Sequence, residues 1–337
     1  MKRQRIGALL VVATLCVAIA AALGLRLGST VVDGQSSAPI SRNSQVPRAA
    51  DGHPDLQAVW NFSSLTPLER PAEFSGRPTI SLAEAAQYEK SVMDRNNADR
   101  RDGGANADLA RAYNDGWYDR GTHVAIVNGA ARTSLIVDPA DGRIPALTAD
   151  AQRRAGERAQ QRRDHASDGP EDRSLAERCL GFNAGPPMLP GPYNNYMQLF
   201  QFKDHVIIFN EMIHDARVVP LDGRSHLPAT VRRYLGDSIG RWEGNTLVVD
   251  TTNFTDKTNF RGASDRMHLV ERFTRVDADT LLYEFTVDDP TSFTKGWSAA
   301  VPMKRTDEQL FEYACHEGNE AMVGILGGAR YEDRQKP

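Results

Sequence analysis

The sequence has 337 residues, with 40 lysine and arginine residues against 44 aspartate and glutamate residues, and a formal net charge of −4. This near balance excludes the strong basic field that nucleic-acid binding needs, and it also excludes a long acidic tail. We therefore expect a small-molecule or protein partner, rather than nucleic acid. The length suits one large domain or two small ones.

The chain begins with a targeting pattern. Lys2, Arg3 and Arg5 precede residues 6–25, which contain no charged side chain. This run is longer than most signal-peptide cores and just long enough to cross a bilayer. We predict that residues 1–30 are a cleaved signal peptide or, alternatively, an inner-membrane anchor. In both cases the rest of the chain is exported, to the periplasm or beyond, and an anchor would be its only contact with the membrane.

The exported part divides into a tether and one domain. Residues 31–50 are rich in Ser, include two Pro and show little periodicity, a pattern typical of a flexible tether. Residues 51–337 are predicted to form a single domain. This domain contains Cys179 and Cys315, and an even pair of cysteines in an oxidising compartment favours a disulfide. Two buried free thiols are the alternative.

Two helices are predicted in the first half of the domain. Ser81 is followed three residues later by Glu84, which is a capping-box pattern for a helix over 82–100. Thr148 caps a second helix over 149–166, which is almost wholly polar and is expected to be exposed. Short strands are predicted over 56–62 and 132–137.

From residue 196 onward, short strands alternate with tight turns. The predicted strands are 196–202, 205–212, 237–242, 246–252, 268–276, 280–288, 297–305 and 309–315. Regular strands of this kind favour a meander that closes into a barrel or folds as a sandwich. We predict a mainly β fold, an antiparallel meander closing into a lipocalin-like barrel, with the N-terminal helices packed on it.

Four stretches of the domain are distinctive. They read RTSLIVDP at 132–139, EMIHDAR at 211–217, WEGNTLVVDTTNF at 242–254 and YACHEGN at 313–319. In these stretches the sequence resembles a family of uncharacterised secreted bacterial proteins, over about residues 51–330. The resemblance implies export and a single family domain. It assigns no catalytic residue.

A dense polar cluster follows the strand predicted over 205–212. If 206–217 were one strand, Glu211, Asp215 and Arg217 would share one face, and His214 would lie on the other. A buried histidine needs a partner, and a carboxylate would orient it and raise its pKa, so His214 could act as a general acid or base. The alternative is a structural histidine beside an Asp215–Arg217 pair that fixes a turn.

His316 and Glu317 directly follow Cys315. A bond between Cys315 and Cys179 would bring them beside the Gly- and Pro-rich loop that precedes residue 193, and a disulfide at this point would preorganise a site. The alternative is the start of a helix or turn at 316–319. The predicted acid–base groups are His214, Asp215, His316 and Glu317, and the predicted substrate-binding groups are Tyr193, Asn194, Asn195, Glu211 and Arg217.

Further polar residues fall on the predicted strands. Asp250, Glu271, Arg272 and Glu284 either face the interior or form a solvated outer face, and the outer face is favoured. Glu271 and Glu284 could pair with arginines on neighbouring strands.

Known cofactor motifs are absent from the sequence. It contains no nucleophile elbow of the GxSxG type, no phosphate-binding glycine loop, no dinucleotide fingerprint and no HExxH zinc motif. We therefore expect neither a cofactor nor a metal ion. The alternative is a zinc or non-haem iron site built from His214, His316 and a carboxylate such as Asp215 or Glu317.

Three functions remain open. The favoured one is an exported, cofactor-independent enzyme, a lyase, isomerase or hydrolase, that acts on a small apolar or aromatic molecule by acid–base chemistry. The second is a periplasmic binding or carrier protein, which a cavity without His214 or His316 in its wall would favour. The third is an envelope interaction protein, which a filled barrel would favour.

Overall fold

The structure is a computed structural model, and it describes residues 46–101, 103–110, 114–182, 185–258 and 260–335. The predicted signal peptide or anchor at 1–30, and most of the predicted tether, lie outside these ranges. Within them, every helix is too short or too polar to cross a membrane.

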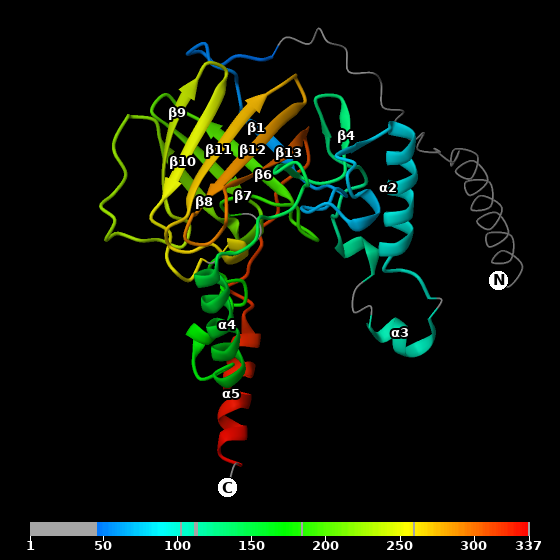
Figure 1. Cartoon of the computed structure of the whole chain (residues 1–337), viewed down its shortest axis with the longest axis vertical. Coiled ribbons are helices and arrows are strands. Elements are labelled where there is room, and N and C mark those ends of the chain that lie inside the picture. Colours follow the sequence, from blue (N-terminus) through cyan, green and yellow to red (C-terminus); the bar gives the residue numbers. More distant parts are fainter. Residues whose placement is uncertain (1–45, 102, 111–113, 183–184, 259, 336–337) are drawn as a thin grey trace, which may run out of the picture. The chain divides into compact units, whose positions relative to one another are not determined.

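A ten-stranded sheet organises the described chain (Figure 1). Its order is β8-β7-β6-β1-β13-β12-β11-β10-β9, with β5 paired to β13 beside β1, and every pairing is antiparallel. The strands are β1 (Ala58–Asn61), β5 (Ile136–Asp138), β6 (Tyr196–Gln201), β7 (His205–Asn210), β8 (Ala216–Pro220), β9 (Asp237–Glu243), β10 (Thr246–Thr252), β11 (His268–Arg275), β12 (Thr280–Asp288) and β13 (Trp297–Thr306).

The remaining elements are short strands and helices. A small sheet has the order β2-β4-β3, and four α-helices and five 3₁₀ turns complete the described chain. These elements are β2 (Thr79–Ile80), β3 (Ile126–Val127), β4 (Ala130–Arg132), α2 (Leu82–Asn96), α3 (Gly104–Ala110), α4 (Ala149–Asp164), α5 (Glu320–Asp333), η1 (Ala72–Phe74), η2 (Asp115–Trp117), η3 (Pro170–Asp172), η4 (Met212–His214) and η5 (Phe260–Gly262).

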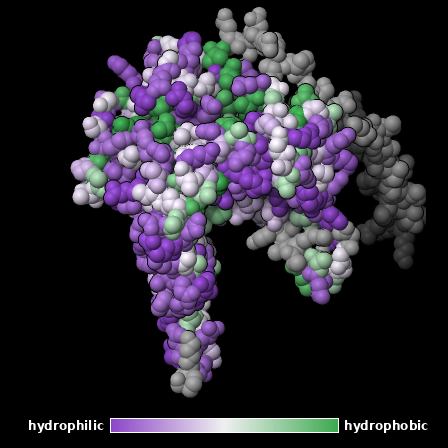
Figure 2. Space-filling model, viewed as in Figure 1, coloured by the Kyte–Doolittle hydropathy of each residue, from purple (hydrophilic) through white to green (hydrophobic). Residues whose placement is uncertain are grey.

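The helix starts follow the sequence prediction. Ser81 forms the capping box with Glu84 at the start of α2, and the Thr148 side chain accepts the Ala151 N–H at the start of α4. Of the residues in α4, only Ala151 is buried, which confirms the expected exposed polar helix. Hydrophilic side chains also dominate the face shown in Figure 2.

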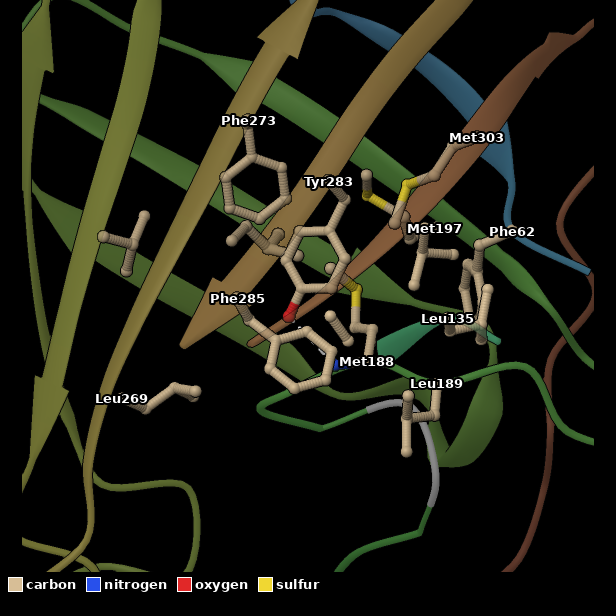
Figure 3. Packing of buried hydrophobic residues seen from close by; sticks show 14 of the residues in the cluster. Phe62, Leu135, Met188, Leu189, Met197, Leu269, Phe273, Tyr283, Phe285 and Met303 are labelled. Atoms are coloured by element: carbon tan, nitrogen blue, oxygen red, sulfur yellow. Dashed lines mark hydrogen bonds between the residues drawn. The ribbon is translucent and has the colours of Figure 1, made fainter. Parts of the chain in front are cut away.

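Alternation of buried and less buried residues defines the inner face of β11 and most of β12. On β11 every second residue is buried, and the buried residues of β12 include Tyr283, Phe285 and Val287. Strand geometry places such residues on one face. Figure 3 shows Phe273, Tyr283 and Phe285 packed against one another and beside Met188. Each large apolar side chain that is fully buried in this way contributes about 1.5–3 kcal/mol of transfer free energy.

The sheet is rolled. The side chain of Arg217 on β8 reaches Glu271 on β11, with N–O distances of 2.5 and 2.9 Å. In a flat sheet six strand spacings, each about 4.8 Å, would separate these strands by about 29 Å, far beyond the reach of both side chains. At the sheet's two ends, a Cβ on Gly240 of β9 would come within 2.9 Å of Val219 on β8.

The mainly β, antiparallel class is therefore confirmed. The pairings among the described strands do not include a ladder between β8 and β9. Closure into a lipocalin-like barrel remains a prediction.

Two strand predictions are wrong. The described residues 307–319 contain no strand, although a strand was expected over 309–315, and α5 follows them. The reason is that β13 already pairs with β12 along one edge and with β1 and β5 along the other, so no edge is free. The strand expected over 132–137 is divided between the two sheets, because β4 ends at Arg132 and β5 begins at Ile136.

Candidate functional site

The connection between β7 and β8 is a strained turn, and the expected continuous strand over 206–217 is wrong. Backbone φ is +63° at Ile213 and +48° at His214. A left-handed conformation is a genuine outlier for a β-branched residue and costs about 1–3 kcal/mol. Ile213 is buried in the main hydrophobic cluster, and this burial holds the turn in place. The turn removes His214 and Asp215 from the strand alternation.

His214 faces His316 across this turn. The two ring centroids are 6.4 Å apart, in an edge-to-face arrangement. Nδ1 of His214 lies 2.9 Å from the carbonyl oxygen of Tyr313. Because a carbonyl can only accept, Nδ1 carries the hydrogen and donates it, and Nε2 is the acceptor nitrogen of the neutral ring.

Asp215 completes this group. Burial raises the pKa of Asp215, although the nearby charges of His214 and His316 act to lower it. The structure thus brings three of the four predicted acid–base groups together. Glu317, the fourth, is exposed, and its side chain makes no hydrogen bond or ion pair with the described residues.

A disulfide and several hydrogen bonds fasten the segment that carries His316. Cys179 and Cys315 are bonded, which confirms the predicted disulfide. Within residues 307–319, the Glu308 carboxylate accepts the Tyr196 hydroxyl at 2.8 Å. The Asn319 side chain donates to the Glu177 carbonyl at 2.9 Å. The position of His316 therefore depends on contacts with residues far away in the sequence.

Three predicted substrate-binding residues also serve this segment. Glu211 is buried and accepts the Phe311 N–H at 2.9 Å. Burial raises the pKa of Glu211, while hydrogen bonds from Phe311 and the Asn194 side chain act to lower it. Tyr193 stacks on Tyr313, with ring centroids 6.3 Å apart. Glu211 and Asn194 therefore position the segment, and Tyr193 gives it an aromatic neighbour.

Asn195 does not fit the substrate-binding role predicted for it. Its side chain is fully buried. Its amide donates to the carbonyl oxygens of Asp119 and Gly191, at 2.5 and 3.0 Å, and its oxygen accepts the Gly191 N–H at 2.7 Å. Because backbone groups satisfy this side chain inside the protein, Asn195 fixes the loop and leaves no polar atom for a ligand.

Arg217 was also predicted to bind substrate, and the structure places it in the core instead. Its guanidinium donates two hydrogen bonds to the carboxylate of the fully buried Glu271. The same carboxylate accepts a hydrogen bond from the Tyr283 hydroxyl at 2.8 Å. Burial raises the pKa of Tyr283 well above its ordinary value, so the hydroxyl remains a donor. The hydroxyl in turn accepts the Met188 N–H at 3.1 Å (Figure 3). We call Arg217, Glu271 and Tyr283 the core triad.

A second polar chain lies over β9, β10 and β11, and sequence reasoning missed most of it. Nδ1 of His226 is 3.1 Å from Asp237, and Nε2 is 3.0 Å from Asp250, which also contacts Nε2 of His268 at 3.0 Å. Arg224 binds Asp237 with both terminal nitrogens. Asp237 therefore contacts both Arg224 and His226, and Asp250 contacts both His226 and His268.

This chain predicts a stability loss in acid. Burial acts to raise the pKa of Asp237, but hydrogen bonds from Arg224 and the Leu227 N–H outweigh it and hold the value at about 2, against 3.8 ordinarily. Because the folded pKa is depressed, the stabilisation is complete above pH 4 and is lost as the pH falls through 2. The difference corresponds to about 2 kcal/mol.

The measurement is urea unfolding of wild type and Asp237→Asn between pH 6 and pH 2. Asp237→Asn should be the less stable protein at pH 6 and should lose less free energy of unfolding between pH 4 and pH 2. Asp256→Asn, at an exposed carboxyl, is the control and should follow wild type. Equal acid losses in Asp237→Asn and wild type would contradict the assignment.

Two pockets are prominent in the described part of the chain. One, of about 410 Å³, lies between the segment 64–68, α2 and the loop 189–192. The other, of about 590 Å³, lies between α4 and the segment 171–182. Neither pocket has His214 or His316 in its wall.

The chain matches no protein-family model, no curated protein and no solved structure. The resemblance to secreted bacterial proteins therefore remains a prediction. Among the residues that the structure describes, no three His, Cys, Asp or Glu side chains are grouped so that they could hold a metal ion.

Proposed function

We propose that the protein is an exported, cofactor-independent enzyme that acts on a small apolar or aromatic molecule through acid–base chemistry, as a lyase, isomerase or hydrolase. The observation that carries the proposal is the group formed by His214, His316 and Asp215, in which two imidazoles lie 6.4 Å apart beside a carboxyl whose pKa is raised.

The groups have distinct roles in this proposal. The Tyr313 carbonyl fixes the tautomer of His214, so its Nε2 is the base. The raised pKa of Asp215 increases its protonated fraction and suits it to donate a proton. His316, on the facing segment, lies opposite His214 and can bind or protonate the same reacting group. Proton transfer is most effective when the pKa of the acid or base is near the working pH.

The surroundings support positioning and export. The strained turn at Ile213 fixes the direction of His214, and rigid support of this kind preorganises a site. Tyr193 and Tyr313 offer aromatic surface to an apolar substrate. We also propose that the rolled sheet closes as a lipocalin-like barrel, which the contact of Gly240 with Val219 supports. The disulfide suits an oxidising compartment such as the periplasm.

A general proton-abstraction probe tests the proposal while the natural substrate is unknown. 5-Nitrobenzisoxazole is a small aromatic molecule that opens to a coloured phenolate when a base removes its C–H proton. Wild type should open it faster than buffer. His214→Gln should lower the rate over buffer by about 100-fold or more, the usual contribution of a positioned base. Asp215→Asn should change the dependence of the rate on pH.

His123→Gln provides the matched control, because its imidazole is 82% exposed and lies 3.5 Å from the Glu89 carboxylate, as an imidazole beside a carboxyl group outside the candidate site. It should leave the rate unchanged. If His214→Gln and His316→Gln both open the probe as fast as wild type, the acid–base assignment is wrong.

A small-molecule binding or carrier protein is the second candidate. The observation that favours it is that neither prominent pocket has His214 or His316 in its wall. Such a protein would bind a ligand in a pocket and would not open the probe.

A further inference from the structure

We propose that the 410 Å³ pocket binds a small organic acid, which places one anionic group on two arginines and an apolar body between two hydrophobic clusters. We call it the arginine pocket, and the residues used in the argument are Leu65, Val92, Arg120, Leu135, Leu189 and Arg261. The inference deepens the second candidate function and is independent of the acid–base proposal, since the histidine pair does not line this pocket.

The apolar walls come from two separate clusters. Leu135 and Leu189 are buried members of the large cluster inside the rolled sheet. Leu65 and Val92 belong to the small cluster that α2 covers. Ligand pockets occur preferentially at such junctions and at the mouths of barrels. An apolar body in the pocket would therefore meet carbon atoms on both sides.

The charge of the pocket has one sign. Among the described residues that line it, Arg120 and Arg261 are the charged ones, and none of these lining residues is a carboxylate. An apolar pocket with only cationic side chains selects for an anion. Guanidinium groups match carboxylates well, because two parallel N–H groups can bind both oxygens.

The two arginines are prepared differently for a ligand. Arg120 is already positioned: its guanidinium lies 3.5 Å above the Tyr118 ring, and Nη1 donates to the Asn96 carbonyl at 3.3 Å. Its contact with the half-exposed Asp115 is longer, at 3.7 Å, and neutralises it only in part. The Arg261 side chain has no hydrogen bond or ion pair with any described residue. Its backbone is left-handed, with φ of +54°.

The size of the pocket limits the ligand. Its volume lies in the lower part of the range for small-molecule sites, which is about 300–1,000 Å³. Its lining also includes Asn96, whose side-chain amide can donate to a further oxygen of the ligand. A compact acid with one or two rings fits this combination better than a long-chain lipid.

Three probes that share one ring system and differ in charge test the proposal on the full chain. They are 2-naphthoate, the neutral 2-naphthalenemethanol and the cationic 2-naphthylmethylammonium, and binding is measured by isothermal titration calorimetry. We expect one binding site, with an affinity for 2-naphthoate about 10-fold higher than for the alcohol. A hydrogen bond to a charged group contributes at least this factor to the affinity. The ammonium ion should not bind measurably.

Substitutions locate the site. Arg261→Gln and Arg120→Gln should each weaken 2-naphthoate binding by about 10-fold and leave the affinity for the alcohol unchanged. Arg266→Gln is the control, because it removes an exposed arginine from the same segment outside the pocket. Circular dichroism confirms that each variant is folded.

Three outcomes would overturn the inference. The first is equal affinity for the three probes, and the second is the absence of 2-naphthoate binding at about 1 mM, which corresponds to a very weak binding free energy. The third is equal weakening of 2-naphthoate binding by Arg266→Gln and Arg261→Gln. None of these outcomes affects the histidine pair, which is tested by turnover of 5-nitrobenzisoxazole. Failure of the pocket and failure of the acid–base proposal are therefore distinguishable.

Discussion

Glu271→Ala is expected to lower the free energy of unfolding by about 3–5 kcal/mol. The substitution leaves the Arg217 guanidinium buried without its partner, and it also removes the acceptor of the Tyr283 hydroxyl. A buried charge without a partner keeps its full desolvation cost, which is why removal of one member costs more than the pair itself contributes. Urea unfolding, followed by tryptophan fluorescence, measures the loss.

Two comparisons separate this effect from a general loss of packing. The double variant Arg217→Met/Glu271→Leu removes both charges and should recover much of the stability, because apolar side chains can replace a buried pair. The pair formed by Arg272 and Glu243 is about 40% exposed, and its removal should cost less than about 1 kcal/mol. If Glu271→Ala cost no more than loss of this surface pair, the core triad would not brace the sheet.

The same ion pair shows where sequence reasoning about the fold succeeds and where it ends. Alternation correctly predicted the strands β9 to β12, because residues on one face of a strand recur at every second position. The solvated outer face favoured for Glu271 is wrong, because this residue shares the buried face of β11 with Leu269 and Phe273. The pairing of Glu271 with Arg217 could not be predicted from alternation. The orientation expected for Arg217 assumed one continuous strand over 206–217, and the left-handed residue Ile213 breaks that strand.

The strand predicted over 309–315 is absent for a different reason. Its composition suits a strand, but a strand also needs a free sheet edge, and β1 and β5 already occupy that edge of β13. These partners lie more than 150 residues earlier in the sequence, so no local pattern reports the competition.

The candidate site was predicted in part, and one covalent link explains why. The disulfide expected from the compartment places His316 near the turn that carries His214, and the structure brings these rings together. The chain through His226, Asp237 and Asp250 was missed, because it depends on how a long loop folds back over β9 and β10. The only signal for this chain in the sequence was that carboxylates fall on predicted strands next to a loop that contains a histidine.

Removal of the disulfide by Cys179→Ser/Cys315→Ser is expected to cost up to about 5 kcal/mol of stability. The two cysteines are 136 residues apart, and the chain-entropy model assigns this amount to a loop of that length. Urea unfolding of the double variant, and of wild type with and without reductant, measures the cost. Reduced wild type should match the double variant.

How this cost is distributed decides what the disulfide does for the candidate site. The segment that carries His316 retains four hydrogen bonds when the disulfide is absent. They are Tyr196–Glu308, Phe311–Glu211, His214–Tyr313 and Asn319–Glu177. If these bonds suffice, global stability falls while the segment remains resistant to protease. If they do not, the segment is cut between residues 307 and 319 before the sheet unfolds, and the turnover that depends on His316 is lost first. Equal stability and equal protease resistance with and without the disulfide would show that it positions nothing. We expect early cleavage, because four hydrogen bonds, each worth about 1 kcal/mol, cannot offset the ordering of a segment this long.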